Sequence, residues 1–401
     1  MSFGKIQAPL VSIIVINHNY GRFLDECLMS IAHQTYPYIE CIVFDNASSD
    51  NSRSVLAAAE RKYAEEDGRS LFVIFSETNL DQTPGAVEAF KYANGSYIIF
   101  FDADDYMLPT CVEAHIRTML SLRIPVGATC VDYFMSRDDE LVTSTSTAGF
   151  SQAATDPGGG EPLIRSTIAL PQTSKTGAEL NLQPSELHAI ARTRRDWPWS
   201  GTCGLCFRRE TIEILFRRTP QIKQQLDAYL IGGVNCLTGS VLIDRPLVVY
   251  RHHGANAFAQ HPYLANFRMY DPKAQRVAAS ITADEIVKTF VAVSDELAKR
   301  LEWAGLFVEA IETLSAVWSP APRRSATVAY MREFLKTNEA ALVAAFGPRE
   351  YANWVARYSS HRIAWSVVAD FSRSLIHAAT ALIPGEGHSV EKQTDRPVGT
   401  A

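Results

Sequence analysis

The sequence predicts an α/β protein with a doubly wound, mostly parallel sheet that is flanked by helices and followed by a helical extension. Over the first hundred residues, short apolar runs typical of buried strands alternate with segments of helical periodicity. Polar residues directly follow three of these runs, at the strand ends where doubly wound sheets bind ligands. From about residue 275 onward the pattern is mostly helical. The chain has 401 residues, 47% of them hydrophobic, which is enough for a sizeable core.

Strand and helix signals alternate in the amino-terminal part. The expected strands are 10–16 ("LVSIIVI"), 40–45 ("ECIVFD"), 71–75 ("LFVIF") and 97–101 ("YIIFF"). The expected helices are 21–34, a second from Asp50 or Ser52 to about Glu66, and 84–93. Strands that alternate with helices in this way indicate a parallel sheet.

The middle of the chain departs from this alternation. Residues from about 136 to 196 are rich in Ser, Thr, Gly and Ala, which predicts a flexible excursion. Near its end, 184–195 has a helical pattern that closes on Arg192, Arg194 and Arg195. Such a basic end suits either a phosphate contact or a solvated helix terminus, where cations interact favourably with the helix dipole.

The later part of the chain divides into regions of different pattern. Strand patterns return at 200–209 and, as two short strands around Pro246, at 241–253. The stretch 363–383 is amphipathic, and its apolar face packs on the chain or, in a minority interpretation, forms a peripheral contact with a membrane. The predicted regions are an α/β domain over 1–262, a helical region over 263–384 and a disordered tail over 385–401.

Composition narrows the class of function. The net charge is −6, which argues against nucleic acid as a partner because phosphate backbones require a basic surface. The 7 cysteines have no repeating spacing, so a reduced setting fits better than a disulfide framework. No signal-peptide pattern and no membrane-spanning apolar run is present, so we expect a cytoplasmic protein, in the alternative peripheral at the membrane. The oligomeric state stays open.

Three carboxylates crowd together after the last of the early strands. Asp102, Asp104 and Asp105 directly follow the apolar run 97–101. Clustered carboxylates at a strand end suit a hard divalent cation such as Mg²⁺, which water and substrate phosphate oxygens also coordinate. The alternative is a solvated turn in which Asp105 caps the following helix. The matched polar ends of the neighbouring strands favour the metal site.

Three motifs together resemble one known family. They are "VSIIVINHNYGRFLDECLMSIAHQTYPYIECIVFDNASSDNS", "GSYIIFFDADD" and "LVVYRHHGAN", in this order. The sequence resembles a family 2 glycosyltransferase of GT-A fold over about residues 9–260, outside the excursion. The resemblance implies an inverting, metal-dependent transfer of a sugar from a nucleotide-diphospho-sugar to an acceptor hydroxyl. The implied acceptor is a carbohydrate or a lipid-linked glycan, in glycan or polysaccharide assembly.

The resemblance also implies roles for single residues. Asp104 would be the metal ligand, with His253 reaching the metal or the diphosphate, and oxygen ligands with one imidazole suit Mn²⁺ or Mg²⁺. Asp50 matches a position that is structural rather than ligand-binding. The positions implied to contact the nucleotide-sugar are Asn19, Asp45, Asn46 and Asp102.

The transfer needs a general base, because the acceptor hydroxyl loses its proton as it attacks. Asp227 stands near the family's Glu-Asp position and is the expected base, although Leu226 replaces the Glu. The helix before the metal strand reads "GAVEAF" and lacks the Arg that the family usually places there. Trp197 and Trp199 are candidates for acceptor binding, since sugar faces stack on indole rings; the alternative is core packing.

Two other interpretations remain. A degenerate relative would bind a nucleotide-sugar without turnover, which the missing Arg and Glu keep open. A nucleotidyltransferase fits less well, because "NHNYGRF" lacks the Gly-rich, basic loop that would hold a triphosphate. The pair Cys203 and Cys206 has metal-ligand spacing, but a single pair in a strand-like run is expected to be buried.

Overall fold

The computed structural model describes most of the chain. The described residues are 7–65, 70–137, 140–146, 150, 153, 180–254, 256, 272–316 and 324–359. The predicted amphipathic stretch 363–383, the tail 385–401, the boundary at 262 and much of the excursion lie outside them. Those predictions therefore stay predictions.

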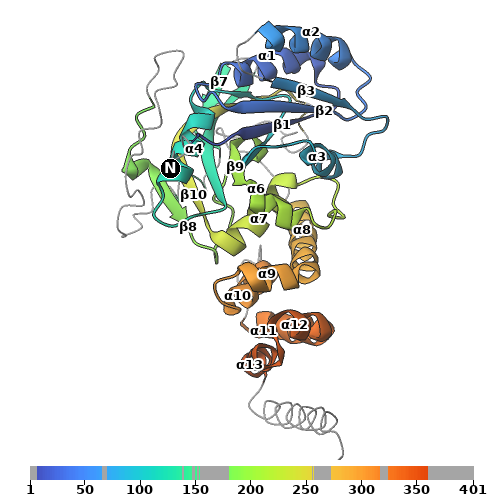
Figure 1. The fold of residues 1–401 in the computed structure, drawn as a ribbon, viewed down its shortest axis with the longest axis vertical. Helices are drawn as coiled ribbons and strands as arrows, with labels where there is room; N and C mark the ends of the chain where they lie inside the picture. Colours follow the sequence, from blue (N-terminus) through green and yellow to red (C-terminus); the bar gives the residue numbers. More distant parts are fainter. Residues whose placement is uncertain are drawn as a thin grey trace, which may run out of the picture.

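Ten strands form one sheet with helices on both faces (Figure 1). The strands are β1 Val11–Asn17, β2 Ile39–Asp45, β3 Ser70–Phe75, β4 Tyr97–Asp102, β5 Tyr106–Met107, β6 Ala128–Arg137, β7 Glu140–Thr143, β8 Leu187–Ile190, β9 Leu205–Arg208 and β10 Ser240–His252. The α-helices of this part are α1 Gly21–Ala32, α2 Ser52–Glu65, α3 Gln82–Phe90, α4 Cys111–Ser121, α6 Arg209–Leu215 and α7 Leu226–Thr238. Two short 3₁₀-helices are η1 Pro184–Glu186 and η2 Thr202–Gly204.

The sheet is mixed. Its strand order is β3-β2-β1-β4-β9-β6-β10-β5, with β7 paired to β6 and β8 paired to β10. The strands from β3 to β4 are parallel, as predicted, because helices form the crossovers between them. β6 and β10 are also parallel, whereas β5, β7, β8 and β9 pair antiparallel with their neighbours. The α/β class is confirmed, and the second half of the sheet is less parallel than the sequence indicated.

Two hydrophobic clusters cover the two faces of the sheet. On β1, Ile14 belongs to one cluster while Ile13 and Val15 belong to the other, as the alternation of side chains along a strand requires. The face of Ile13 packs against α1, α2 and α4. The face of Ile14 packs against α3, α6 and α7, which lie on the opposite side in Figure 1.

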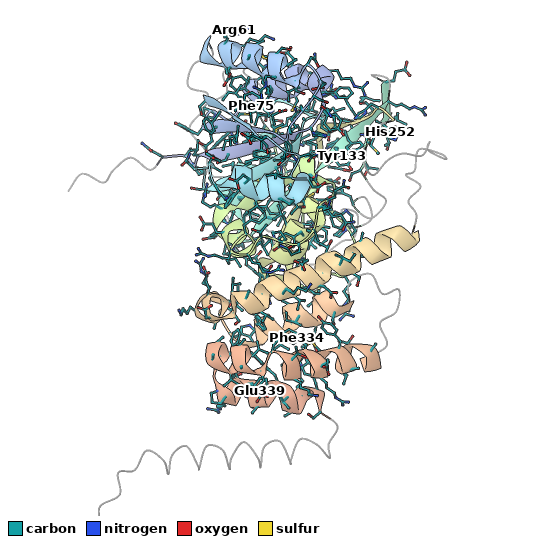
Figure 2. All side chains as sticks on the ribbon, turned by 90° about the vertical axis from the view of Figure 1, so that its right-hand side faces the viewer. Arg61, Phe75, Tyr133, His252, Phe334 and Glu339 are labelled. Atoms are coloured by element: carbon teal, nitrogen blue, oxygen red, sulfur yellow. The ribbon has the colours of Figure 1, made fainter. Side chains whose placement is uncertain are left out.

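The predicted helical extension is confirmed for the described residues. Its helices are α8 Pro272–Ala292, α9 Ser294–Arg300, α10 Gly305–Ala316, α11 Arg324–Thr337, α12 Glu339–Phe346 and α13 Pro348–Tyr358. Phe290 of α8 and Phe307 of α10 belong to the same cluster as Tyr229 of α7, so the extension packs directly on the α/β part. Figure 2 shows the stack, with Phe334 and Glu339 at its far end. None of the described helices is long and apolar enough to cross a membrane.

Two local predictions were wrong. The helix expected over 184–195 is a single 3₁₀ turn followed by β8, which pairs antiparallel with residues 240–243 of β10. Pairing along a sheet edge overrides the weak helical pattern of the isolated segment. The two strands expected around Pro246 are one long strand, β10, with register shifts on both sides of Pro246. The shifts accommodate a residue that cannot donate to the ladder.

The polar strand ends lie along one edge of the sheet, as predicted. Asn17, at the end of β1, is in register with Asp45 at the end of β2. On the other side of β1, Ile16 is in register with Asp102 at the end of β4. The carboxyl ends of these parallel strands therefore present their polar side chains to the same space.

Asp50 holds the starts of two helices, in line with the structural role expected for it. Its carboxylate accepts a hydrogen bond from the N–H of Gly21, where α1 begins, at 2.9 Å, and from the N–H of Ser52, where α2 begins, also at 2.9 Å. These are amide groups that the helices themselves leave without partners. One side chain thus fixes α1 and α2 relative to each other.

We expect Asp50→Ala to lower the free energy of unfolding by about 1–2 kcal/mol, the usual cost of losing a helix cap. The measurement is urea denaturation followed by circular dichroism. Asp25→Ala is the matched control, because Asp25 lies on exposed α1 surface and forms only an exposed ion pair with Lys62. It should cost less than about 1 kcal/mol. Equal losses in the two variants would contradict the capping role.

Candidate functional site

A cavity of about 470 Å³ lies beyond the carboxyl ends of β1, β2 and β4. Its far walls come from η2, from the start of α7 and from α8. The cavity is acidic: the carboxylates that line it are Asp81, Asp102, Asp104 and Asp227. Among the described residues of its lining there is no Lys or Arg. The predicted site residues Asn46 and Trp197 also line it, whereas Asn19, Asp45, Trp199 and His253 do not.

The acidic turn after β4 directs its three carboxylates differently. Asp102 ends the strand and lines the cavity. Asp104 is nearly buried, and its Oδ2 lies 3.0 Å from Nε2 of His253. Asp105 is fully buried, and its Oδ1 accepts a hydrogen bond from the backbone N–H of Arg251 at 2.9 Å. Asp105 therefore belongs to the interior of the protein rather than to the cavity wall.

Buried Arg251 clamps this turn and was missed at the sequence level. Its guanidinium donates to the backbone oxygen of Asp104 and to the carboxylate of Glu26 on α1. The guanidinium carbon also lies 4.7 Å from the ring centroid of Phe23 and 5.3 Å from that of Tyr106. A buried cation needs such partners, and here Glu26 supplies the balancing charge while the turn supplies backbone oxygen.

The signal for Arg251 was present in "LVVYRHHGAN". Only His253 was taken from that motif, although Arg251 and Asn256 complete it. Asn256 accepts a hydrogen bond from the N–H of His253 at 2.9 Å and donates to the backbone oxygen of Arg251 at 2.8 Å. The motif thus folds on itself and presents one cation and one imidazole to the acidic turn.

His253 is held in place on several sides. Its Nδ1 lies 3.3 Å from Nη2 of Arg22, and its ring contacts those of Tyr20 and Phe23 at centroid distances of 5.7 and 4.6 Å. Because a guanidinium can only donate, Nδ1 is the acceptor and Nε2 carries the proton that is donated to Asp104. In this arrangement His253 orients Asp104. The predicted metal contact would require Nε2 to exchange this partner for the ion.

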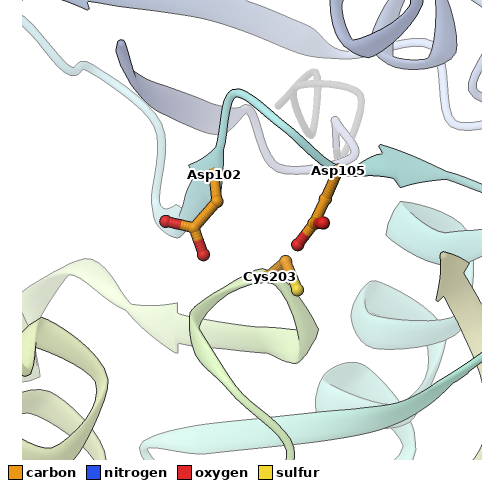
Figure 3. Close-up of side chains that lie close together, drawn as sticks. All are labelled: Asp102, Asp105 and Cys203. Atoms are coloured by element: carbon orange, nitrogen blue, oxygen red, sulfur yellow. The ribbon is translucent and has the colours of Figure 1, made fainter. Parts of the chain in front are cut away.

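A second group near the turn consists of Asp102, Asp105 and Cys203, whose possible ligand atoms all lie within 4.8 Å of one another. Figure 3 shows the Cys203 thiol of η2 facing both carboxyl groups across a narrow gap. Burial and the neighbouring carboxylates of Asp104 and Asp102 raise the pKa of Asp105 well above its usual value. Cys203 and Cys206 are both buried, as expected from the sequence.

Asp102 and Asp227 line the same cavity, and the negative charge of Asp227 acts on Asp102. Burial raises the pKa of Asp102 to about 8, and the negative charges of Asp104 and Asp227 add to this, while hydrogen bonds from Gln82 and Thr202 oppose it. The two carboxyl groups come from β4 and α7, which are far apart in the sequence. The fold therefore brings the expected base into the same cavity as the expected donor-binding carboxylates.

Asp227 lies in the first turn of α7, and its position depends on the residues just before it. Gln225 adopts a left-handed conformation with φ of 67°, and its side chain accepts a hydrogen bond from the hydroxyl of Thr282 on α8 at 2.7 Å. Asp227 Oδ1 accepts from the N–H of Ala228 at 2.8 Å. A Cβ atom on Gly201 would lie 4.0 Å from Asp227 Oδ2, so that oxygen borders the small space above Gly201.

Asn19, Asp45 and Asn46 mainly order the loops around the cavity. Asn19, with φ of 61°, accepts a hydrogen bond from the N–H of Ser49 at 2.7 Å. Buried Asp45 accepts from the side chain of Asn17 at 2.7 Å. Asn46 accepts from the N–H of Leu80 at 2.7 Å and donates to the backbone oxygen of Asp81 at 3.1 Å. Their contacts with a nucleotide-sugar stay predictions.

The two tryptophans occupy different environments. Trp199 is buried in the core, and its indole N–H donates to the hydroxyl of Ser240 at 2.9 Å. Trp197 is partly exposed, lines the cavity and contacts the Trp199 ring edge-on at a centroid distance of 5.5 Å. Among the predicted acceptor residues, only Trp197 is available to the cavity. Sequence reasoning missed the stacked rings of Tyr133 and Tyr250, which also line it (Figure 2 labels Tyr133).

This fold and site define a class of protein: an α/β domain with an acidic cavity at the carboxyl edge of a sheet. The model of the family described as "Glycosyl transferase family 2" matches residues 12–157. That region of the chain is thus similar to family 2 of the glycosyltransferases, and the mixed sheet with its flanking helices is of the GT-A type.

Two similar proteins are also named as enzymes that transfer a sugar. An uncharacterised glycosyltransferase of Nostoc sp. is 26% identical over 248 residues, which cover 61% of this chain and 66% of that protein. The UDP-Glc:alpha-D-GlcNAc-diphosphoundecaprenol beta-1,3-glucosyltransferase of Escherichia coli is 29% identical over 140 residues, 35% of this chain and 49% of that protein. The matches thus span between about half and two thirds of these relatives. Among solved structures, S. aureus TarS 1–349 in complex with UDP-GlcNAc aligns with a TM-score of 0.44 at 14% identity, covering 84% of this chain and 89% of that one.

The raised pKa of Asp102 predicts a pH dependence of stability. Its folded pKa of about 8 lies above the value of about 4 expected in the unfolded chain. Between these values the folded protein binds more protons than the unfolded chain, so stability falls as the pH rises through this window. We expect the melting temperature of the metal-free protein to decrease from about pH 5 to about pH 8, with a shallower slope in Asp102→Asn. Differential scanning calorimetry with a chelator present measures both slopes, and parallel slopes would show that Asp102 is not the group responsible.

Proposed function

We propose that this protein is an inverting, metal-dependent glycosyltransferase that moves a sugar from a nucleotide-diphospho-sugar to an acceptor hydroxyl in glycan or polysaccharide assembly. The observation that carries the proposal is the charge of the cavity. Asp102, Asp104 and Asp227 line it together, and no Lys or Arg of the described residues does. A diphosphate could enter such a cavity only with a cation that neutralises both it and the carboxylates.

The residues present fit a divalent cation. Asp104 and Asp102 supply carboxylate oxygens, which are the ligands that Mg²⁺ and Mn²⁺ favour, and the imidazole of His253 lies next to Asp104. When bound, the cation would stabilise the negative charge on the departing nucleoside diphosphate as a Lewis acid.

The chain's own groups would carry the proton and position the reactants. Asp227 accepts the proton of the acceptor hydroxyl as its oxygen attacks the anomeric carbon of the donor sugar. The bond between that carbon and the diphosphate oxygen breaks on the opposite face, so the configuration inverts and no covalent enzyme intermediate forms. Trp197, on the same side of the cavity as Asp227, offers an indole face to the acceptor sugar.

The nucleotide half of the donor would occupy the sheet edge beside β1 and β2. Asn46 lines the cavity there with His18, whose Nδ1 lies 2.8 Å from the backbone oxygen of Asn46. Asn19 and Asp45 hold the loop that forms this wall. The Escherichia coli relative, whose name specifies UDP-Glc and a lipid-linked GlcNAc acceptor, supports a role in glycan assembly with a carbohydrate or lipid-linked acceptor. A peripheral position at the cytoplasmic membrane surface would suit such an acceptor.

We expect Asp104→Ala to abolish metal-dependent binding of the donor. Without Asp104 the cation loses its main ligand, and the diphosphate then meets the remaining carboxylates unneutralised. Isothermal titration calorimetry with UDP-, GDP- and dTDP-sugars, with and without Mn²⁺ or Mg²⁺, tests this. Asp244→Ala, an exposed change in the middle of β10, should bind like the wild type. Retained metal-dependent affinity in Asp104→Ala would refute the ligand assignment.

We expect Asp227→Asn to keep donor binding and to lower transfer by about 10²–10⁴-fold, the usual effect of removing a general base. The amide preserves the shape of the side chain and its oxygen can still accept from Ala228. Nucleotide release with a broad acceptor panel measures the rate. Full transfer by this variant would exclude Asp227 as the base. Tight metal-dependent donor binding by the wild type with no transfer to any acceptor would favour the degenerate, non-catalytic alternative.

A further inference from the structure

A second, smaller cavity of about 40 Å³ adjoins the acidic one. Trp197, Ala228 and Ala279 line both cavities, so the two cavities share these three side chains as a common wall. Ala228 directly follows the proposed base in α7. The second cavity therefore lies on the acceptor side of the site, next to the atoms that would react.

The walls of the second cavity are mostly apolar and its rim is basic. The walls come from α7, from α8 and from Leu314 of α10, with Ile286 and Ala283 among the α8 residues. Arg194, Arg195 and Asp196, in the loop after β8, line the same cavity, and the two arginines outnumber the one carboxylate. Its electrostatic character is thus opposite to that of the acidic cavity beside it.

Of the two rim cations, Arg195 is the one whose charge is not balanced. Arg194 Nη2 donates to Asp196 Oδ2 at 2.7 Å, so this pair is close to neutral. Arg192, two residues earlier, pairs with Glu309 of α10 at 3.5 Å. Arg195 is exposed, and within the described ranges no acidic side chain forms an ion pair with it.

The local fold removes one of the two explanations for this basic run. The segment before it is the strand β8 and not a helix, so the arginines do not balance a helix dipole. Arg195 instead stands at the rim of a cavity that opens beside the acceptor side of the active site. A guanidinium presents several N–H donors in a planar fork, a geometry that suits phosphate oxygens.

We infer that the second cavity binds a phosphate group carried by the acceptor, and that Arg195 is the residue that selects it. This inference rests on the proposed function, because it assigns the acceptor side of the same site. An anionic acceptor would be repelled by the carboxylates of the acidic cavity. Arg195 holds the phosphate outside that cavity, while the sugar reaches past Trp197 toward Asp227.

The phosphate has two sources that share this chemistry. It is either the terminal group of a free sugar phosphate or part of a diphosphate that links a sugar to a lipid. The apolar walls contributed by Ile286 and Leu314 accommodate the carbon atoms next to the phosphate in both cases.

The test compares acceptors that share one sugar and differ in the group on its anomeric oxygen. Glucose, galactose and N-acetylglucosamine are each offered as the methyl glycoside, as the 1-phosphate and as a short-chain prenyl diphosphate. Calorimetry measures binding to the full chain, and nucleotide release measures donor turnover on the same samples. The variants are Arg195→Ala, Arg195→Lys and, as matched control, Arg61→Ala, which removes an exposed arginine from α2, on the face of the sheet opposite to α7 (Figure 2 labels Arg61).

We expect a phosphate-bearing form to bind the wild type more tightly than its methyl glycoside, and this preference to fall about tenfold or more in Arg195→Ala. Arg195→Lys should retain part of it, and Arg61→Ala all of it. A preference shared by both phosphate forms supports a free sugar phosphate as the ligand, and a further gain with the prenyl diphosphate supports the lipid-linked one. The inference is overturned if no phosphate form is preferred, or if Arg195→Ala keeps the full preference. Failure of the proposed function is seen separately, as absence of metal-dependent nucleotide release by the wild type.

Discussion

The buried guanidinium of Arg251 is the contact on which the active site depends. It joins β10, the acidic turn after β4 and α1, because its side chain and backbone bond Asp104, Asp105 and Glu26 together. The guanidinium bonds the backbone oxygen of Asp104 and the carboxylate of Glu26, while the backbone N–H of Arg251 bonds the carboxylate of Asp105, so the turn is held without any cation in the cavity. The turn therefore has a defined shape before any ligand arrives. Preorganisation of this kind spares a ligand the cost of ordering its own site.

The site separates charges of opposite sign over a short path. The cavity at the sheet edge is lined by carboxylates, whereas the smaller cavity beyond Trp197 has a basic rim. The acidic cavity suits an anion that is bound to a cation, whereas the smaller cavity suits an anion without one. Under the proposed function, this separation would direct donor and acceptor to different cavities, so that neither would compete strongly for the other's place.

The sequence predicted the part of the sheet from β1 to β4 well. Continuous apolar runs left little choice of structure for β1 to β4, and parallel pairing then forced their polar ends onto one edge. The part of the chain around β8, Trp199 and β10 was predicted less well. Residues 187–190 form a strand that pairs with β10, and Trp199 is buried in the core with its N–H bonded to Ser240. Such outcomes depend on partners about 40 to 56 residues away, which local patterns do not contain.

Single residues illustrate the same limit. Asp104 could be singled out because a carboxylate after a buried strand has few structural reasons to be there. The left-handed backbone of Asn19 and its bond to Ser49 exist only in the folded loop, so the sequence could not show them, and its contact with a nucleotide-sugar stays a prediction. Arg251 stood in a recognised motif, yet its burial was not visible there. An arginine in a strand is ordinarily expected at the surface.

The wall shared by the two cavities has a consequence for how such a protein can diversify. Ala279 belongs to α8, which lies beyond the region that matches the family, and it lines both cavities. A larger or polar side chain at that one helical position would reshape the acceptor pocket while leaving β1, β2 and β4 untouched. Under the proposed function, a substitution at this one position of α8 would change acceptor choice while the acidic turn stays the same. Exchange of the helical extension between relatives would be a way to engineer the same change in the acceptor pocket.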